Sequence, residues 1–296
     1  MKITTFLKKE YKYLLFILPA FLIYTIVTVI PVIGTLFYSF TNFNGLSMDF
    51  KFEGLSNYIK VFTTSEVKTS FINSIIFGIA NPVIITVLAI PLAVVLNSKM
   101  KTKNIQRAVF FFPSVISALF LGYIWNFILS PSSMGLVNSV LTHLGFDKML
   151  LLSDINLAMV LLILVNVWCN LGWHACIYVA NMQLIDTTYY EAAKIDGATA
   201  FQQFKSITLP MLAPAMTSSI MLLITSSLKA FDLPFALTSG GPGYATTMIT
   251  QTIITEGVSA NRVGFASAMS VLFLLVIGLF TVIQNAIMRK REENLL

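Results

Sequence analysis

Three side chains on one predicted helix face could hold a sugar. In the apolar stretch Ile155–Tyr178, the residues Asn166, Asn170 and Trp173 follow one another at i, i+4 and i+7, so they share one face of a helix. Amides can exchange hydrogen bonds with sugar hydroxyls, and an indole ring offers an apolar face to sugar C–H groups. The same residue types also form hydrogen bonds between membrane helices and aromatic belts at membrane interfaces. Both interpretations stay open at this point.

The next apolar stretch adds further candidates for contact with a substrate. Met221 and Thr225 lie within it, although a hydroxyl at such a position can also bond its own helix backbone. Lys229 and Asp232 flank its end and are placed to pair with each other. We therefore treat Met221 and Thr225 as candidate substrate-binding residues.

Catalytic, metal and cofactor chemistry is not predicted. No nucleophile–base or acid–base pair lies at a plausible depth, so we expect no catalytic residues and no enzyme. His143 and His174 have no Cys, Asp or Glu nearby at ligand spacing, which argues against a metal site. The run Gly240–Gly243 is not followed by Gly-Lys-Ser/Thr, so it predicts a turn rather than a phosphate-binding loop. Energy for any active process must then come from a partner.

The composition predicts a membrane protein. Of the 296 residues, 56% are hydrophobic and 11% are charged, whereas about a quarter of the residues of a soluble domain are charged. So few charges cannot cover a surface that faces water, and we expect lipid to surround most of the chain.

Six apolar stretches are long enough to cross a bilayer as helices, which takes about 20 residues each. They are Leu14–Phe40, Phe71–Leu96, Ala108–Leu129, Ile155–Tyr178, Met211–Leu228 and Gly264–Met288. The sequence therefore predicts an all-α membrane protein with six transmembrane helices, located in the cell membrane.

The Lys and Arg residues of the short loops predict the orientation, because they favour the cytoplasmic side. One side carries Lys2, Lys8, Lys9, Lys12, Lys99, Lys101, Lys103, Arg107, Lys194, Lys205, Arg289, Lys290 and Arg291. The other side carries only Lys51, Lys60, Lys68, Lys148 and Arg262. We expect both termini in the cytoplasm. This asymmetry also accounts for the net charge of +6, so no nucleic-acid partner is predicted.

A polar segment between the fourth and fifth stretches should then face the cytoplasm. Thr188 and Glu191 have the spacing of a capping box, with Asp186 and Thr187 as further capping options. Gly197 is a plausible helix terminator, and Thr199-x-x-Gln202 offers a second capping box. We expect a helix, a glycine bend and a second helix, with Pro210 in the first turn of the fifth span. Docking of another protein and an amphipathic loop on lipid headgroups are both compatible with this pattern.

The same segment resembles the cytoplasmic signature of binding-protein-dependent ABC importer permeases. The matching residues are Glu191, Ala192, Ala193, Gly197, Ile207, Leu209 and Pro210. In that family the segment is a coupling helix that docks in a cleft of an ATP-binding subunit. The resemblance therefore implies ATPase coupling by these residues, and a type I ABC importer permease fold.

A second stretch, Phe231 to Thr246, reads FDLPFALTSGGPGYAT and resembles the first of the two paired subunits in sugar permeases related to the maltose and glycerol-3-phosphate systems. The implied partners are a second homologous permease, two ATP-binding subunits, an extracytoplasmic sugar-binding protein and membrane lipid. The implied layout is a cytoplasmic N-terminus over 1–12, one permease domain over 13–288 with its coupling segment at 186–210, and a tail over 289–296. The alternative is a secondary transporter or channel for small polar solutes that works without an ATPase.

Overall fold

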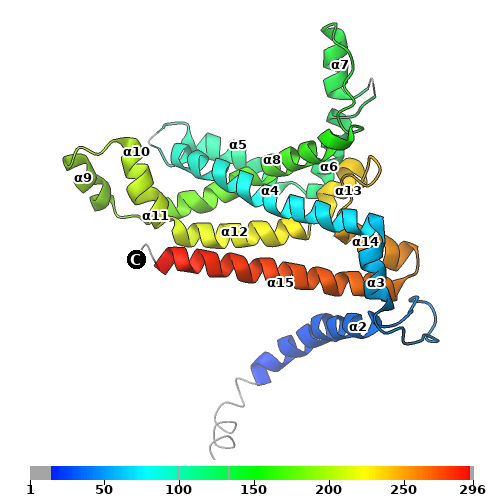
Figure 1. The fold of residues 1–296 in the computed structure, drawn as a ribbon. Coiled ribbons are helices and arrows are strands. Elements are labelled where there is room, and N and C mark those ends of the chain that lie inside the picture. The colour runs from blue at the N-terminus through cyan, green and yellow to red at the C-terminus, as the bar shows by residue number, and fades with distance from the viewer. Residues whose placement is uncertain (1–14, 99, 133, 294–296) are drawn as a thin grey trace, which may run out of the picture. The chain divides into compact units, whose positions relative to one another are not determined.

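The computed structural model describes residues 15–98, 100–132 and 134–293, and these residues are mainly helical (Figure 1). They form two compact units, which we describe separately. One unit comprises the chain up to Thr64 together with Ile253–Phe273, and the other comprises Ser65–Thr252 together with Leu274–Leu296. Leu14 and the predicted N-terminal segment 1–12 lie outside the described residues.

Within the described ranges, four helices are long and apolar enough to cross a membrane. They are Leu15–Tyr38, α4 (Ser65–Leu96), α8 (Ile155–Met182) and Val263–Lys290 within α15 (Val263–Glu293). Two bent helix pairs raise the number to as many as six, if each pair is one span. The first helix includes the π-helical turn η1 (Thr25–Val29) and α2 (Ile30–Tyr38). The prediction of an all-α membrane protein is confirmed at this level.

The third predicted span is not one straight helix. It consists of α5 (Lys103–Val115) and α6 (Ala118–Ile128), which meet at a bend of 96°. Ile116 has an extended backbone, so the ladder of helical hydrogen bonds ends there. Each arm packs on a different helix: α5 contacts α8, and α6 contacts α13 (Asp232–Thr238). These separate contacts are a tertiary effect, which the apolar pattern of residues 108–129 does not reveal.

The fifth predicted span is bent as well. The helical run from α10 (Ala200–Gln203) through the π-helical turn η2 (Phe204–Thr208) to α11 (Leu209–Met211) meets α12 (Ala213–Leu228) at 66°. Pro210 therefore lies before the bend, and Pro214 occupies the first turn of α12 instead. A proline is well suited to that position because the first turn needs no N–H donor.

Helices α4, α8 and α12 lie side by side and form the core of the larger unit (Figure 1). Gly172 of α8 lets the backbone of α5 approach closely, since a Cβ at this position would collide with the carbonyl of Phe110. Between α8 and α12, the buried His174 Nδ1 and Ser219 Oγ are hydrogen-bonded at 2.7 Å. Small residues and buried polar pairs are the usual basis of helix packing in lipid.

The connecting segments of this unit are also ordered by side-chain hydrogen bonds. Arg107 donates from both Nε and a terminal guanidinium nitrogen to the carbonyl of Leu96, which satisfies the C-terminal end of α4. The loop with α7 (Leu136–His143) is closed by the buried Asn138, which bonds to the backbone of Ser130 and Met149. After α13, the predicted turn at Gly240–Gly243 is present and leads to α14 (Ile249–Ile254).

The smaller unit contains α3 (Ser56–Thr63), the π-helical turn η3 (Thr255–Ser259) and the first part of α15. The fully buried Asn57 amide donates to the carbonyls of Ser39 and Thr41, so it fixes the loop that follows the first helix. The backbone of Gly264 then packs on this loop, where its N–H donates to Phe43. Arg262 and Glu256 form an ion pair at 2.6 Å.

Candidate functional site

The segment between α8 and α12 begins with a capped helix, α9 (Thr187–Ile195). The cap is Asp186, whose carboxylate accepts the N–H of Thr188 at 2.9 Å. This hydrogen bond holds the pKa of Asp186 below its ordinary value. The predicted capping box of Thr188 and Glu191 is therefore wrong. Because Asp186 is the N-cap, Thr188 already lies inside the helix.

Gly197 ends α9, as predicted. Its backbone has φ +76°, and its N–H donates to Lys194 at 3.1 Å. The next N–H, that of Ala198, reaches back to the carbonyl of Ala193 at 2.9 Å. These two bonds constitute a Schellman motif, which requires a left-handed residue at the position of Gly197. The bend is therefore a defined structure.

The second helix begins with the predicted capping box. The N–H of Thr199 donates to the Gln202 side chain at 2.7 Å, and the Gln202 N–H donates to the Thr199 hydroxyl at 3.3 Å. Further on, Leu209 donates to the carbonyl of Phe204, five residues earlier, which defines the π-helical turn η2. Pro210 follows and has no N–H to continue an α-helical ladder, which is consistent with the wider turn before it.

The predicted coupling residues fall into two groups. Glu191, Ala192 and Gly197 are exposed, and Ala193 is partly exposed. Ile207, Leu209 and Pro210 are half-buried, and Leu209 packs against the hydrophobic core. The segment also exposes two large apolar side chains that the signature does not include, because Ile195 is 87% and Phe201 is 72% accessible. One part of the segment can therefore meet a partner while the other joins the helices.

The two halves of the segment are tied together at their base. The hydroxyls of Tyr190 in α9 and Thr208 in η2 are hydrogen-bonded at 3.0 Å. Gln203 donates from its amide to the carbonyl of Ala198 at 2.9 Å, which closes the bend from the inside. A cavity of about 320 Å³ separates this base from the ends of α4 and α8, with Asn97 and Met182 in its wall. Motion of either half would therefore be transmitted to the other.

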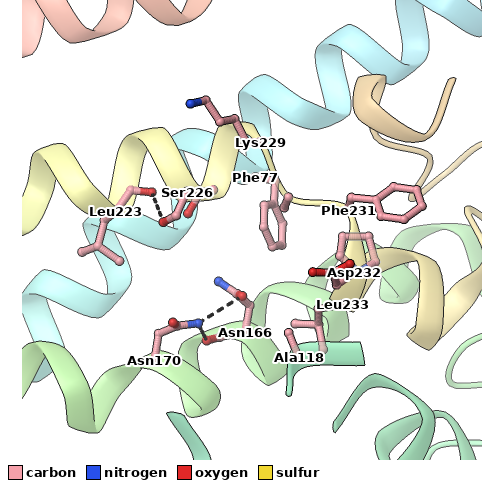
Figure 2. A pocket seen from close by; sticks show the side chains of 13 residues that line it. Phe77, Ala118, Asn166, Asn170, Leu223, Ser226, Lys229, Phe231, Asp232 and Leu233 are labelled. Carbon is pink, nitrogen blue, oxygen red and sulfur yellow. Dashed lines mark hydrogen bonds between the residues drawn. The ribbon is translucent and has the colours of Figure 1, made fainter. Parts of the chain in front are cut away.

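A second cavity, of about 290 Å³, lies where α12 leads into α13 (Figure 2). Its polar wall is a chain of amides. Asn170 donates to the side-chain oxygen of Asn166 at 3.2 Å, and Asn166 donates to Asn81 of α4 at 2.8 Å. Asn81 is fully buried and donates to the carbonyl of Phe77 at 2.9 Å. The chain of amides thus joins α8 to α4, while Asn166 and Asn170 also line the cavity.

The rest of the wall comes from α12 and from the segment after it. Ser226 lines the cavity, and its hydroxyl donates to the carbonyl of Leu223 at 3.1 Å. Lys229 and Asp232 also line it, and among the described residues they form no ion pair with each other. The rings of Phe77 and Phe231 supply apolar surface. Mixed polar and aromatic walls are typical of small-molecule sites, and the volume is near the lower end of their roughly 300–1,000 Å³ range.

The structure brings only some of the predicted substrate residues together. Asn166 and Asn170 line the cavity, whereas Trp173, Met221 and Thr225 are not in its wall. Trp173 is 38% exposed and its ring lies edge-on to His174. The hydroxyl of Thr225 donates to the carbonyl of Met221 at 2.8 Å, so it bonds its own helix.

Comparison with known proteins identifies the family. Residues 70–293 match the family described as binding-protein-dependent transport system inner membrane component. The chain belongs to this family. It is 37% identical over 287 residues to a probable starch degradation products transport system permease protein of Thermoanaerobacterium thermosulfurigenes, with 97% of each chain covered. It is 30% identical over 279 residues to a trehalose/maltose transport system permease protein of Thermococcus litoralis, with 94% of each covered.

The fold agrees with this family. The chain superposes with a TM-score of 0.85 and 21% identity on a chain of a bacterial alginate ABC transporter, solved in complex with an alginate pentasaccharide-bound periplasmic protein. The match covers 99% of both chains. The protein is therefore a multi-pass membrane component with the fold of an ABC importer permease.

Sequence reasoning missed Phe77 and Phe231 in the wall of this permease cavity, and also Asn81, which lies behind the wall and bonds to Asn166. Asn81 was not among the candidates, although a polar residue inside a predicted span is a signal that could have found it. Phe77 and Phe231 carry no such signal, because phenylalanine is abundant throughout the chain. Their place in the wall depends on how α4 and α13 pack, which no local pattern specifies.

Proposed function

We propose that this chain is the permease subunit of an ATP-driven sugar importer and that the segment from Asp186 to Pro210 couples it to ATP-binding subunits. The observation that carries the proposal is the local structure of this segment. It has two capped helices, a Schellman bend at Gly197 and exposed apolar side chains at Ile195 and Phe201. A rigid segment with such a surface can dock into another protein and transmit its movement.

The sugar substrate is supported by two independent observations. The cavity at the end of α12 combines amides, a hydroxyl, a carboxylate and aromatic rings, which suit the hydroxyls and C–H faces of a sugar. The relatives carry names that refer to starch degradation products and to trehalose and maltose. We propose that Asn166 and Asn170 contact the sugar during its passage. Trp173, Met221 and Thr225 do not line the cavity, and they remain candidates for contact with the sugar elsewhere on its path.

The proposed assembly contains a second homologous permease, two ATP-binding subunits and an extracytoplasmic sugar-binding protein. In the helix Leu15–Tyr38, none of the most apolar 18 residues is buried, so this surface is available for contact with lipid or with a further membrane protein. The proposed orientation places both termini and the coupling segment in the cytoplasm, with six spans in the cytoplasmic membrane. Closure of the ATP-binding subunits would move the two coupling segments together and open the pathway alternately to each side.

Transport assays in proteoliposomes test this function. We expect uptake of a neutral oligosaccharide to require ATP, the ATP-binding subunits and the binding protein. Crosslinking of a cysteine introduced at the exposed Ala192 to an ATP-binding subunit is expected in the same preparation. Uptake driven by an ion gradient in the absence of the ATPase would instead identify a secondary transporter or channel.

A further inference from the structure

The carboxylate of Asp232 has no partner in the described part of the chain. It forms neither a hydrogen bond nor an ion pair there, although it lines the cavity together with Asn166 and Asn170. In Figure 2 the Asp232 oxygens point toward the Asn166 side chain, whereas the Lys229 ammonium points away from both. A negative charge therefore borders the cavity without a cation directed at it.

The other polar groups of the wall include the donors of Ser227 and Lys229, but several of the remaining donors are already used within the protein. The amide nitrogens of Asn166 and Asn170 already donate within the protein, and so does the hydroxyl of Ser226. The Asn170 side-chain oxygen and the Asp232 carboxylate remain as acceptors. Such a wall favours a ligand that is rich in hydroxyl donors and carries no negative charge of its own.

We propose that Asp232 is a specificity-determining residue, which accepts hydroxyls of a neutral sugar and disfavours sugars that carry a carboxylate. This inference rests on the proposed function and names the substrate class of the same cavity. Hydrogen bonds to a charged acceptor are stronger than those between neutral groups. A uronate sugar would bring a second negative charge close to Asp232, and this repulsion would count against it.

Asp232 lies in the first turn of α13, so it could also serve only to stabilise that helix. The test must separate this structural role from a role in specificity. A negative charge near the start of a helix is favourable by itself. The substitution Asp232→Asn keeps the shape and removes the charge, and Asp232→Ser keeps a polar group that helix starts accept well. A loss of helix stability would reduce the transport of every substrate, whereas a specificity role changes the ratio between substrates.

The test uses the complete importer in proteoliposomes with one binding protein throughout. Maltotriose, trehalose and diacetylchitobiose are first tested for uptake, and one that the importer accepts becomes the neutral probe. The acidic probe is the same sugar with one C6 hydroxymethyl group oxidised to a carboxylate. Because the binding protein is the same for every variant, a change in the neutral-to-acidic uptake ratio originates in the permease. We expect this ratio to fall by about tenfold or more in Asp232→Asn and Asp232→Ser, the size expected when a hydrogen bond to a charged group is lost.

Lys229→Gln is the matched control, since it removes the other charge of the cavity wall. Because Lys229 lines the cavity, removing its positive charge can only disfavour the acidic probe, so we expect the neutral-to-acidic ratio not to fall in this variant. An unchanged ratio in both Asp232 variants, or an equal loss of both probes, would overturn the specificity role while leaving the proposed function intact. Absence of ATP-driven uptake of every neutral probe by the unchanged chain would overturn the proposed function, and this inference with it.

Discussion

The coupling segment and the cavity are held together in opposite ways. In the segment, hydrogen bonds span 18 positions or fewer, from Asp186 with Thr188 to Tyr190 with Thr208. At the cavity wall, the bond between Asn81 and Asn166 joins residues 85 positions apart and two different helices. The segment can keep its shape while it moves as a body, whereas the cavity must change shape when α4, α8 and α12 shift. This difference fits a part that transmits force and a part that admits and releases a substrate.

The largest effect is expected at the bend of the coupling segment. Gly197→Val should abolish ATP-driven uptake, because a β-branched residue does not tolerate φ +76° and the Schellman motif would be lost. Apart from the residues next to it in the chain, no described residue has an atom within 4 Å of the position a Cβ would occupy, so backbone strain and not a collision would cause the loss. Uptake is compared with the amount of protein in the membrane, which we expect to be unchanged.

Gly197→Asn provides the control for this prediction. Asparagine tolerates left-handed angles better than other residues with a side chain, so much of the uptake should remain. Equal uptake by Gly197→Val and the unchanged chain would mean that the bend does not transmit force. The segment would then be no more than a loop, and the contrast with the cavity would disappear.

The next effect concerns the fully buried amide that links two helices. Asn81→Ala leaves the half-buried Asn166 amide without its acceptor, which should cost about 1 kcal/mol, the low end of the range for an unpaired polar group. We expect a lower midpoint in thermal unfolding of the purified protein. Asn181→Ala is the matched control, because that amide bonds only within its own helix, to Ile177. Equal midpoints for the two variants would contradict a structural role for the chain of amides.

A smaller effect should separate the two substrate candidates of α8. Asn170 lines the cavity and Trp173 does not, so Asn170→Ala should raise the KM for the imported sugar by about two- to tenfold, as expected for one hydrogen bond. Trp173→Ala should leave this KM within about twofold. The opposite result, with Trp173 dominant, would place the sugar on the exposed face of α8 instead.

The same contrast explains how much could be predicted from the sequence. The glycine bend and the second capping box were found because their hydrogen bonds join residues three to five positions apart. The first capping box was assigned to Thr188, whereas Asp186 is the cap, because capping residues that lie within two positions of each other differ only in which of them the helix includes. Local signals thus specify that a helix begins, but not always where.

Tertiary contacts account for what the sequence did not predict. The bend of 96° between α5 and α6 separates an apolar stretch into two arms that pack on different helices. In the same way, Asn166 and Asn170 share a helix face with Trp173, yet only the two amides reach the cavity. The periodicity of α8 identified a face, and the positions of α4 and α12 decide which part of that face borders the cavity.

The smallest effect is expected at the capping box that starts the second half of the coupling segment. Thr199→Ala removes the side-chain acceptor of the Gln202 N–H and should destabilise this helix start by about 1 kcal/mol. Hydrogen exchange at Gln202 and Gln203 should become faster, while Thr199→Ser should keep the slow rate because serine caps equally well. Uptake should fall by less than about twofold, since Gln203 still closes the bend through Ala198. A much larger loss would mean that local stability of the segment limits transport, and that the segment is closer to its unfolding threshold than the cavity helices are.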